Sequence, residues 1–592
     1  MSSNVRRLDL ALIFLMVLTL FAFLLFRHSA FNFLFYSTII LVALRLFAMA
    51  CRLLSQKTAA YCLLVCSGMS LLVFQSKTPG FEAGHHGAVS SHGIALSKSL
   101  FVDYSGLMFT QYIIREDSAI EFDAYNRFPL FPFLLTGAAA RIGGPILARQ
   151  LYFARQTMNI FFLLALLFAY MTVDRLLQRP LLSVSLVLMT FSSHFMLYYH
   201  DLVFNDIPAL FGCILVFFLI VESRNGIKPW QAALLAAIAI STGWQAYAVL
   251  AAWFFTNVIG MLRYRREQKA GFRTLIRKTS FVALLAGMVW GVTILGLQLL
   301  NEWSRVGGSF SEIPSMVSLL ARTGLRGHGR LSSLPGADWG NFLLSQARRI
   351  WLMILPFNVP YSIPVSGIIK DLFTQGSIAI NQHFSDWRVM ATLAGLTSLF
   401  LTLLVRIGVA IRRRLIDWRI AAVLGLSGAI WALGMRRFVA FHDFQSIFFI
   451  GLPLLLYLAL FLQAKVLHGA RISMALAICS TLLFSFCVFQ DGVAKSLERT
   501  AHEHRFIEFQ VISERLPSGA SIFVDGDRKM AGMAFRELDF YLINTKRVSR
   551  IKAEFVLSPN RNYNEHRLTN NKLLNLFRNQ LRPKRDMDSR DG

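Results

Sequence analysis

Residues 150–173 read QLYFARQTMNIFFLLALLFAYMTV, a nearly continuous apolar run that is long enough to cross a lipid bilayer as one helix. Similar runs recur along the chain. Of its 592 residues, 55% are hydrophobic, and the mean hydropathy is +0.52. A water-soluble domain cannot bury this much apolar surface, so the sequence predicts a polytopic α-helical membrane protein.

Thirteen segments have the length and hydropathy expected of transmembrane helices. They cover residues 8–27, 31–51, 59–75, 150–173, 180–198, 205–222, 229–243, 247–262, 279–299, 388–411, 419–434, 445–463 and 471–489. Long polar loops occupy residues 76–149 and 300–387, and a hydrophilic segment begins near residue 490. The first span follows Arg6 and Arg7 and lacks a small-residue cleavage site, so we expect it to be retained.

Lys and Arg are distributed unevenly between the two ends of these spans. If the N-terminus is cytoplasmic, the inside connections carry most of them, with seven in residues 263–278 alone. The short outside turns carry only Arg27, Arg436 and Arg437. The positive-inside rule then places both long loops and the C-terminal segment outside the cytoplasm. Because this pattern and the basic tail account for the formal charge of +27, we expect no nucleic-acid partner.

Composition divides the chain into four parts. In chain order they are an added transmembrane hairpin, a membrane core, a small α/β domain and a basic disordered tail, at residues 1–58, 59–489, 490–560 and 561–592. Within the α/β domain, residues 521–524 and 555–557 have strand patterns, and residues 535–543 have a helical pattern. The tail is rich in Asn, Arg and Lys, a composition typical of disorder.

A histidine-rich stretch, GHHGAVSSHG at residues 84–93, lies in the first long loop. Apolar residues at helical spacing between His85 and Leu100 predict an amphipathic helix along the membrane. His85, His86 and His92 fall in its first turns, and histidine can take a proton from an attacking hydroxyl near neutral pH. Alternatively, they bond to the backbone or to lipid headgroups. A divalent metal site is left open, although no carboxylate or cysteine stands at ligand spacing.

The same loop continues with EFDAYNRFPLFP at residues 121–132. Asp123 and Arg127 precede a Pro-containing apolar segment that is expected to lie in the membrane interface. A fixed cation at this depth suits a lipid phosphate, which makes Arg127 a candidate for substrate binding. The alternative interpretation is a membrane anchor with solvated charges.

Residues 198–208, YYHDLVFNDIP, form a third polar segment at the outer end of two spans. Asp206 begins a helix and Pro208 follows it, an arrangement typical of a helix N-terminus. Asp206 is therefore either an ordinary first-turn acid or a carboxylate directed into an outer cavity. Asp201 is a further candidate for substrate binding.

A fourth polar segment, RRFVAFHDFQ at residues 436–445, contains Arg436, Arg437 and His442. The two arginines run against the positive-inside bias, which indicates an anionic partner such as a phosphodiester or diphosphate. A salt bridge to Asp443 or to ordinary lipid is the alternative. The sequence contains no Walker A, GxSxG or HExxH motif, which argues against ATP-driven transport and against serine or zinc hydrolysis.

This layout resembles the GT-C superfamily of integral-membrane glycosyltransferases, which use polyprenyl-phosphate-linked sugars. Protein O-mannosyltransferases, lipid A aminoarabinose transferases and rhizobial lipopolysaccharide transferases are relatives of this kind. The resemblance covers residues 59–560 and rests on the outer loop, the RFPLFP segment, Arg149 or Arg155 entering the next span, and Asp206. The first-loop Asp or Asp-Glu of the family is replaced here by His85 and His86, with Glu82 just upstream.

The resemblance implies inverting transfer of a sugar from a polyprenyl-phosphate donor to a hydroxyl of a glycan, lipid or protein, without an obligatory cofactor. It makes His86 or His85 the catalytic base and Asp206 the carboxylate that orients the acceptor or the base, while Glu82 and Asp123 stay open as alternative bases. Arg436 and Arg437 would hold the phosphate. The expected location is a bacterial inner membrane with a periplasmic C-terminus. A transporter or flippase of a lipid-linked saccharide, and a non-catalytic scaffold, are the competing interpretations.

Overall fold

The computed structural model describes residues 55–82, 84–101, 128–264, 279–323, 404–436 and 443–500, together with the strands named below and a few isolated residues. The first two predicted spans, at residues 8–27 and 31–51, lie outside the described residues.

The described part of the chain is a bundle of apolar helices, as the sequence predicts. Five of them are long and apolar enough to cross a membrane, and they span Gln56–Phe74, Leu147–Leu177, Thr279–Arg305, Gln445–Gln463 and Ala470–Thr500. Shorter apolar helices run between them. The predicted class of polytopic α-helical membrane protein is confirmed, whereas the number of thirteen spans stays a prediction.

Most described helices begin near the predicted span limits, and several of them also end near those limits. They are α3 (Gln56–Phe74), α6 (Leu147–Leu177), α9 (Asp206–Glu222), α10 (Pro229–Thr242), α11 (Ala246–Tyr264), α13 (Thr279–Val306), α19 (Trp418–Gly434) and α22 (Ala470–Thr500). Two predicted spans are divided into pairs of helices. The pairs are α7 (Pro180–Phe191) with α8 (His194–Tyr199), and the 3-10 helix η2 (Asp443–Ile450) with α21 (Gly451–Gln463).

The first of these divisions has a local cause. Ser193 adopts an extended backbone, and its Oγ accepts a hydrogen bond from Met196 N at 3.3 Å. A serine in this position caps a new helix instead of continuing the old one. The resulting break turns the chain at the C-terminal end of α7, so that α8 and the loop after it form part of the candidate site described below.

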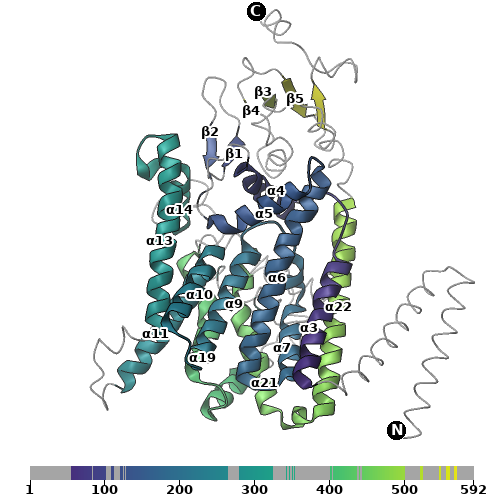
Figure 1. Cartoon of the computed structure of the whole chain (residues 1–592), viewed down its shortest axis with the longest axis vertical. Helices are drawn as coiled ribbons and strands as arrows, with labels where there is room; N and C mark the ends of the chain where they lie inside the picture. The colour runs from purple at the N-terminus through teal and green to yellow at the C-terminus, as the bar shows by residue number, and fades with distance from the viewer. Residues whose placement is uncertain are drawn as a thin grey trace, which may run out of the picture.

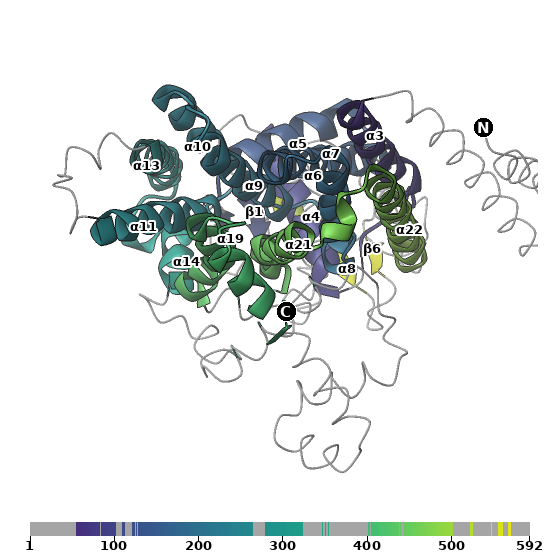
Figure 2. The ribbon, with the colours of Figure 1, turned by 90° about the horizontal axis from the view of Figure 1, so that it is seen from below.

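Figures 1 and 2 show how helices that are far apart in the sequence lie side by side. The last helix, α22, packs against α3 and α7, so it closes the bundle against the first described helix. Helix α6 packs against α9, and α11 packs against both α13 and α19. Gly492 allows the closest approach of α22 to α3, since a Cβ at this position would lie 1.9 Å from the Phe74 carbonyl oxygen.

Two helices of the first long loop, α4 (Gly84–Ser99) and α5 (Leu130–Ile142), lie at the upper end of the bundle in Figure 1. The helix predicted between His85 and Leu100 is confirmed as α4. It is not a simple amphipathic helix, because polar residues such as Ser90 and His92 are buried along with its apolar ones. Its glycine, alanine and serine residues are small enough to allow close packing on several sides.

Short elements complete the described structure. Strands β1 (Phe109–Tyr112) and β2 (Glu121–Ala124) pair antiparallel, with Thr110 opposite Asp123. The remaining helical elements are η1 (Phe310–Glu312), α14 (Pro314–Thr323) and η3 (Lys465–His468).

A four-stranded sheet near the C-terminus has the order β4-β3-β5-β6. Its strands are β3 (Ser521–Val524), β4 (Lys546–Arg547), β5 (Phe555–Pro559) and β6 (His566–Thr569). Strand β3 is parallel to β4 and β5, whereas β6 is antiparallel to β5. The two predicted strands are present as β3 and β5. Strand β6 lies within residues 561–592, for which the sequence predicts disorder. The helix predicted at residues 535–543 lies outside the described residues.

Candidate functional site

The first-loop helix α4 is held tightly against the loop that connects α8 to α9. Val203 N donates a hydrogen bond to Ser90 Oγ at 3.1 Å. One helical turn further, a Cβ at Gly93 would lie 1.9 Å from the Val203 carbonyl oxygen, so only glycine allows this approach. These contacts bring the histidine-bearing helix together with the loop that contains Asp201 and precedes Asp206.

The candidate histidines of α4 occupy different surroundings. His92 is buried, with 1% of its surface exposed. His86 is half-buried, and its ring lies 5.0 Å from the Tyr198 ring and 5.5 Å from the Tyr199 ring, measured between centroids. His85 lies on α4, but its side chain is outside the described part of the structure. His86 is therefore the predicted base whose surroundings are best defined.

Asp206 is the first residue of α9, where a carboxylate interacts favourably with the helix dipole. Gln445 Nε2 donates a hydrogen bond to Asp206 Oδ1 at 2.7 Å, and Trp431 Nε1 donates to Gln445 Oε1 at 3.0 Å. The donor to this carboxylate oxygen is thus a neutral amide, whose own orientation is fixed by an indole.

Asn205, the residue before Asp206, is fully buried. Within the described part of the chain, neither Oδ1 nor Nδ2 of Asn205 has a hydrogen-bond partner. An unsatisfied buried amide is rare and indicates a ligand or an ordered water nearby. The N-terminus of α9 therefore presents a carboxylate and an unsatisfied amide in adjacent positions.

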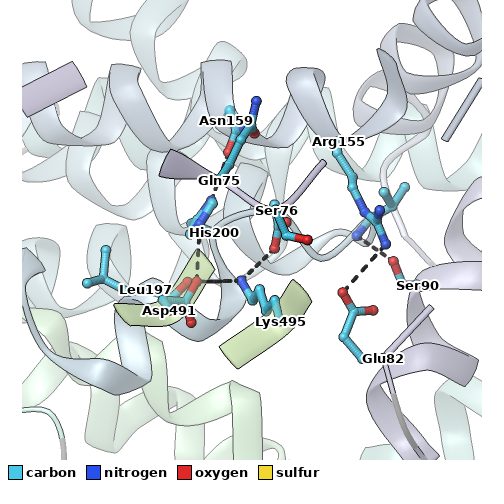
Figure 3. A network of polar contacts seen from close by, with 12 residues as sticks. Gln75, Ser76, Glu82, Ser90, Arg155, Asn159, Leu197, His200, Asp491 and Lys495 are labelled. Carbon is cyan, nitrogen blue, oxygen red and sulfur yellow. Dashed lines mark hydrogen bonds and ion pairs between the residues drawn. The ribbon is translucent and has the colours of Figure 1, made fainter. Parts of the chain in front are cut away.

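Beside this site lies a buried network of charged side chains, part of which is drawn in Figure 3. At one side of the network, Arg499 donates to Glu82 Oε1 from Nε at 3.0 Å and to Asp201 Oδ2 from Nη2 at 2.7 Å. Arg155 Nη2 lies 3.5 Å from the same Glu82 oxygen and donates to the Gly80 carbonyl at 2.7 Å. Residues on α6, on α22, in the segment before α4 and in the loop before α9 therefore meet here.

The other side of the network is built around Lys495. Its Nζ lies 2.6 Å from Asp201 Oδ1 and 2.9 Å from Asp491 Oδ2. His200 Nε2 lies 3.5 Å from Asp491 Oδ2, and His200 Nδ1 lies 2.8 Å from Asn159 Oδ1. Since a carbonyl oxygen can only accept, this contact places a hydrogen on Nδ1 when the amide has the assigned orientation.

Six members of the network are charged, and their negative and positive charges balance. Three are acids and three are bases, and each is at most 5% exposed: Glu82, Asp201, Asp491, Arg155, Lys495 and Arg499. Burial raises the pKa of Glu82, but attraction to Arg499 and Arg155 outweighs burial and leaves that pKa below its ordinary value. Burial likewise raises the pKa of Asp201, and Arg499 and Lys495 hold it well below its ordinary range. Both carboxylates are therefore ionised near neutral pH.

The charge network and the candidate histidine share one aromatic residue. Lys495 Nζ lies 5.4 Å from the centroid of the Tyr198 ring, and the His86 ring packs edge-on against the same tyrosine. The network therefore supports the position of His86 from one side, while Ser90 and Gly93 fix α4 from another.

Several predicted site residues fall at or beyond the limit of the described structure. Arg127, Arg437 and His442 lie outside it, and for Asp123 only the backbone in β2 is described. Arg436 is half-buried and lies two residues after the end of α19. The common outer cavity that the sequence predicts for these residues, and the phosphate clamp of Arg436 and Arg437, stay predictions.

The sequence interpretation missed the contribution of α22. It ended the last span at residue 489, whereas the helix continues to Thr500. The available signal was the spacing of Asp491, Lys495 and Arg499, which repeats every four residues and places all three on one helix face. Glu82, one of the alternative bases, is instead seen to pair with Arg499 and Arg155.

Among the described residues, no group of three or more His, Cys, Asp or Glu side chains is placed to hold a metal ion. The candidate site therefore consists of histidines on α4, Asn205 and Asp206 at the start of α9, and the supporting charge network.

The fold is that of a polytopic helical membrane protein. The structure is similar to that of ArnT from Cupriavidus metallidurans bound to undecaprenyl phosphate, with 13% sequence identity, a TM-score of 0.36, and coverage of 84% of this chain and 87% of that chain. It is also similar to the Archaeoglobus fulgidus oligosaccharyltransferase, with 13% identity, a TM-score of 0.38, and coverage of 84% and 65%. No protein-family profile and no curated protein sequence matches the chain.

Proposed function

We propose that this protein is an integral-membrane glycosyltransferase that moves a sugar from a polyprenyl-phosphate donor to a hydroxyl acceptor on the outer face of the membrane. The observation that carries the proposal is the packing of α4 on the loop before α9, which brings candidate proton acceptors from two distant segments to one end of the bundle. The unsatisfied amide of Asn205 beside Asp206 supports a ligand at the same place.

In the proposed reaction, the acceptor oxygen forms a bond to the anomeric carbon while the bond from that carbon to the lipid phosphate breaks. The proton of the acceptor hydroxyl passes to His86 or to its neighbour His85, and Asp206 orients the acceptor or the base. The lipid phosphate leaves as an anion, and arginine side chains stabilise it, with Arg436 and Arg437 proposed for this role. The sugar configuration is inverted in this single displacement.

The charge network has a supporting role in this proposal. The carboxylates of Glu82 and Asp201 already accept hydrogen bonds from arginine and lysine, whereas Asp206 Oδ1 accepts one from the amide of Gln445. A substrate-binding role of Asp201 stays a prediction. We assign the network to holding α4 and the loop before α9 in register.

The activity is tested with purified protein in proteoliposomes that contain a radiolabelled polyprenyl-phosphate sugar and a membrane-extract acceptor fraction. Release of polyprenyl phosphate together with labelled acceptor supports a transferase. Movement of intact donor across the bilayer without release indicates a flippase and contradicts the proposal. Absence of both processes, across acceptor fractions of lipid, glycan and protein, also contradicts it.

Matched variants connect this activity to the site. Asp206→Asn and Glu222→Gln remove one carboxylate from the first and the last residue of the same helix, α9. We expect Asp206→Asn to lower the rate by roughly 10²–10⁴-fold, the usual contribution of an acid–base group. Glu222→Gln should stay near the original rate. Equal rates for all three proteins would remove Asp206 from the site.

A further inference from the structure

A cavity of about 240 Å³ lies at the end of the bundle opposite to Asp206. It forms where α9 ends, between α11 and the first turns of α13 and α19. Its polar lining consists of Ser223, Arg224, Asn257, Thr279, Ser280 and Arg419. By the charge distribution of the sequence, this end faces the cytoplasm, and the candidate glycosyltransfer site does not use it.

Arg419 presents an uncompensated cation to the cavity. Its Nε is buried and has no hydrogen-bond acceptor within the described part of the chain, and its guanidinium carbon lies 5.8 Å from the centroid of the Trp418 ring. The neighbouring carboxylate is already engaged, because Asp417 Oδ1 caps the Arg419 backbone N–H at 2.8 Å while Oδ2 pairs with Arg224 Nη2. The guanidinium also packs closely on Gly260, where a Cβ would lie 3.0 Å from Nε. Packing therefore holds this cation in place without an anionic partner.

Ser280 provides a second, independent donor. It is 1% exposed and lines the cavity, and its Oγ has no hydrogen-bond partner among the described residues. Ile420 lies in the first turn of α19, where backbone N–H groups lack intrahelical acceptors. Donors from several elements thus surround one small volume.

We propose that this cavity binds a phosphate group, either as free inorganic phosphate or as the headgroup of an anionic lipid. A tetrahedral oxyanion presents acceptors in several directions, which matches donors on α13 and α19. The volume is smaller than the roughly 300–1,000 Å³ of pockets for drug-sized ligands, so it fits a single phosphate and not a nucleotide. The basic connection at residues 412–419 adds a positive field that attracts anions.

The test uses the full-length protein, purified in detergent and stripped of lipid. Binding of ³²P-labelled inorganic phosphate is measured by equilibrium dialysis, and binding of dioctanoyl phosphatidic acid is measured in parallel by native mass spectrometry. The variants are Arg419→Gln, Ser280→Ala and the control Arg413→Gln, which removes an equal charge from an exposed position at the same end.

We expect Arg419→Gln to weaken binding about tenfold or more, which corresponds to loss of a charge-assisted hydrogen bond. Ser280→Ala should weaken it by several-fold, and it keeps the test valid if the arginine variant does not fold. Arg413→Gln should change binding by less than about twofold. Saturable binding of inorganic phosphate alone identifies the ligand of the cavity as a soluble anion. Binding of phosphatidic acid identifies it as a lipid headgroup. Failure to bind either probe, or equal losses in Arg413→Gln and Arg419→Gln, overturns the proposal.

Discussion

Glu82 and Arg499 are separated by 417 positions in the sequence, and Arg499 Nε lies 3.0 Å from Glu82 Oε1 in the buried network. Glu82 comes just before α4, and Arg499 lies in the last turn of α22. The same arginine donates to Asp201 in the loop before α9. One guanidinium in the last turn of α22 therefore connects the segment before α4 to the loop before α9, and these two segments carry the candidate site.

Removal of this guanidinium should destabilise the protein strongly. In Arg499→Leu, Glu82 keeps only the more distant Arg155 and Asp201 keeps only Lys495, so one negative charge stays buried without compensation, and the expected loss in free energy of unfolding is about 3–5 kcal/mol. The measurement is reversible unfolding in mixed micelles. The control is Arg471→Leu, at the exposed opposite end of the same helix, which should change stability by less than about 0.5 kcal/mol. Similar values for both variants would mean that the network contributes little to stability.

Stability should depend on acid pH through Glu82 and Asp201. Their pKa values are lowered in the folded protein, so the stabilisation is fully present above the unfolded carboxyl values of roughly 4 and is lost as the pH falls through the folded values. Thermal unfolding between pH 7 and pH 3 should therefore be flat near neutrality and then decline. Glu82→Gln should unfold at a lower temperature at pH 7 and decline less steeply in acid. Parallel curves for the two proteins would refute this assignment.

Much of the fold was predictable from local patterns. Apolar runs define the helices of the core within a few residues, as in α9 and α10, because hydropathy is a property of each segment alone. The continuation of α22 was not predicted, since charged residues at 491–499 ended the apolar run. Their burial depends on partners from distant segments, and sequence spacing on one helix does not identify such partners.

The site was predictable only in part. The histidines and Asp206 stood out because polar groups at the end of a membrane span require a reason. Asn205 and Gln445 carried no such signal, since an amide in a loop or at a helix end is common. Their significance comes from burial and from the contact to Asp206, which only the tertiary structure supplies.

Gln445 should contribute to activity through Asp206. Gln445→Leu removes the donor to Asp206 Oδ1 and leaves the carboxylate with less support in its present orientation. A hydrogen bond to a charged group is worth about 1.5–3 kcal/mol, so the expected loss of the transfer rate is roughly 10–100-fold. Gln463→Leu, at the C-terminal end of α21, serves as a matched control. Unchanged transfer by Gln445→Leu would show that this contact does not position Asp206 for the reaction.

Gly93 should be more sensitive to added volume than Gly296, another glycine within a helix. In Gly93→Ala, the new Cβ would lie 1.9 Å from the Val203 carbonyl oxygen, so α4 must move away from the loop before α9. We expect a loss of about 1–3 kcal/mol in stability and a larger loss of transfer activity, since the histidines shift relative to Asp206. In Gly296→Ala, nothing lies within 4 Å of the added Cβ, so helix propensity should make this variant slightly more stable. Unfolding and transfer are measured on both variants. If Gly93→Ala keeps full activity, the close contact of α4 with this loop is not what places the catalytic groups.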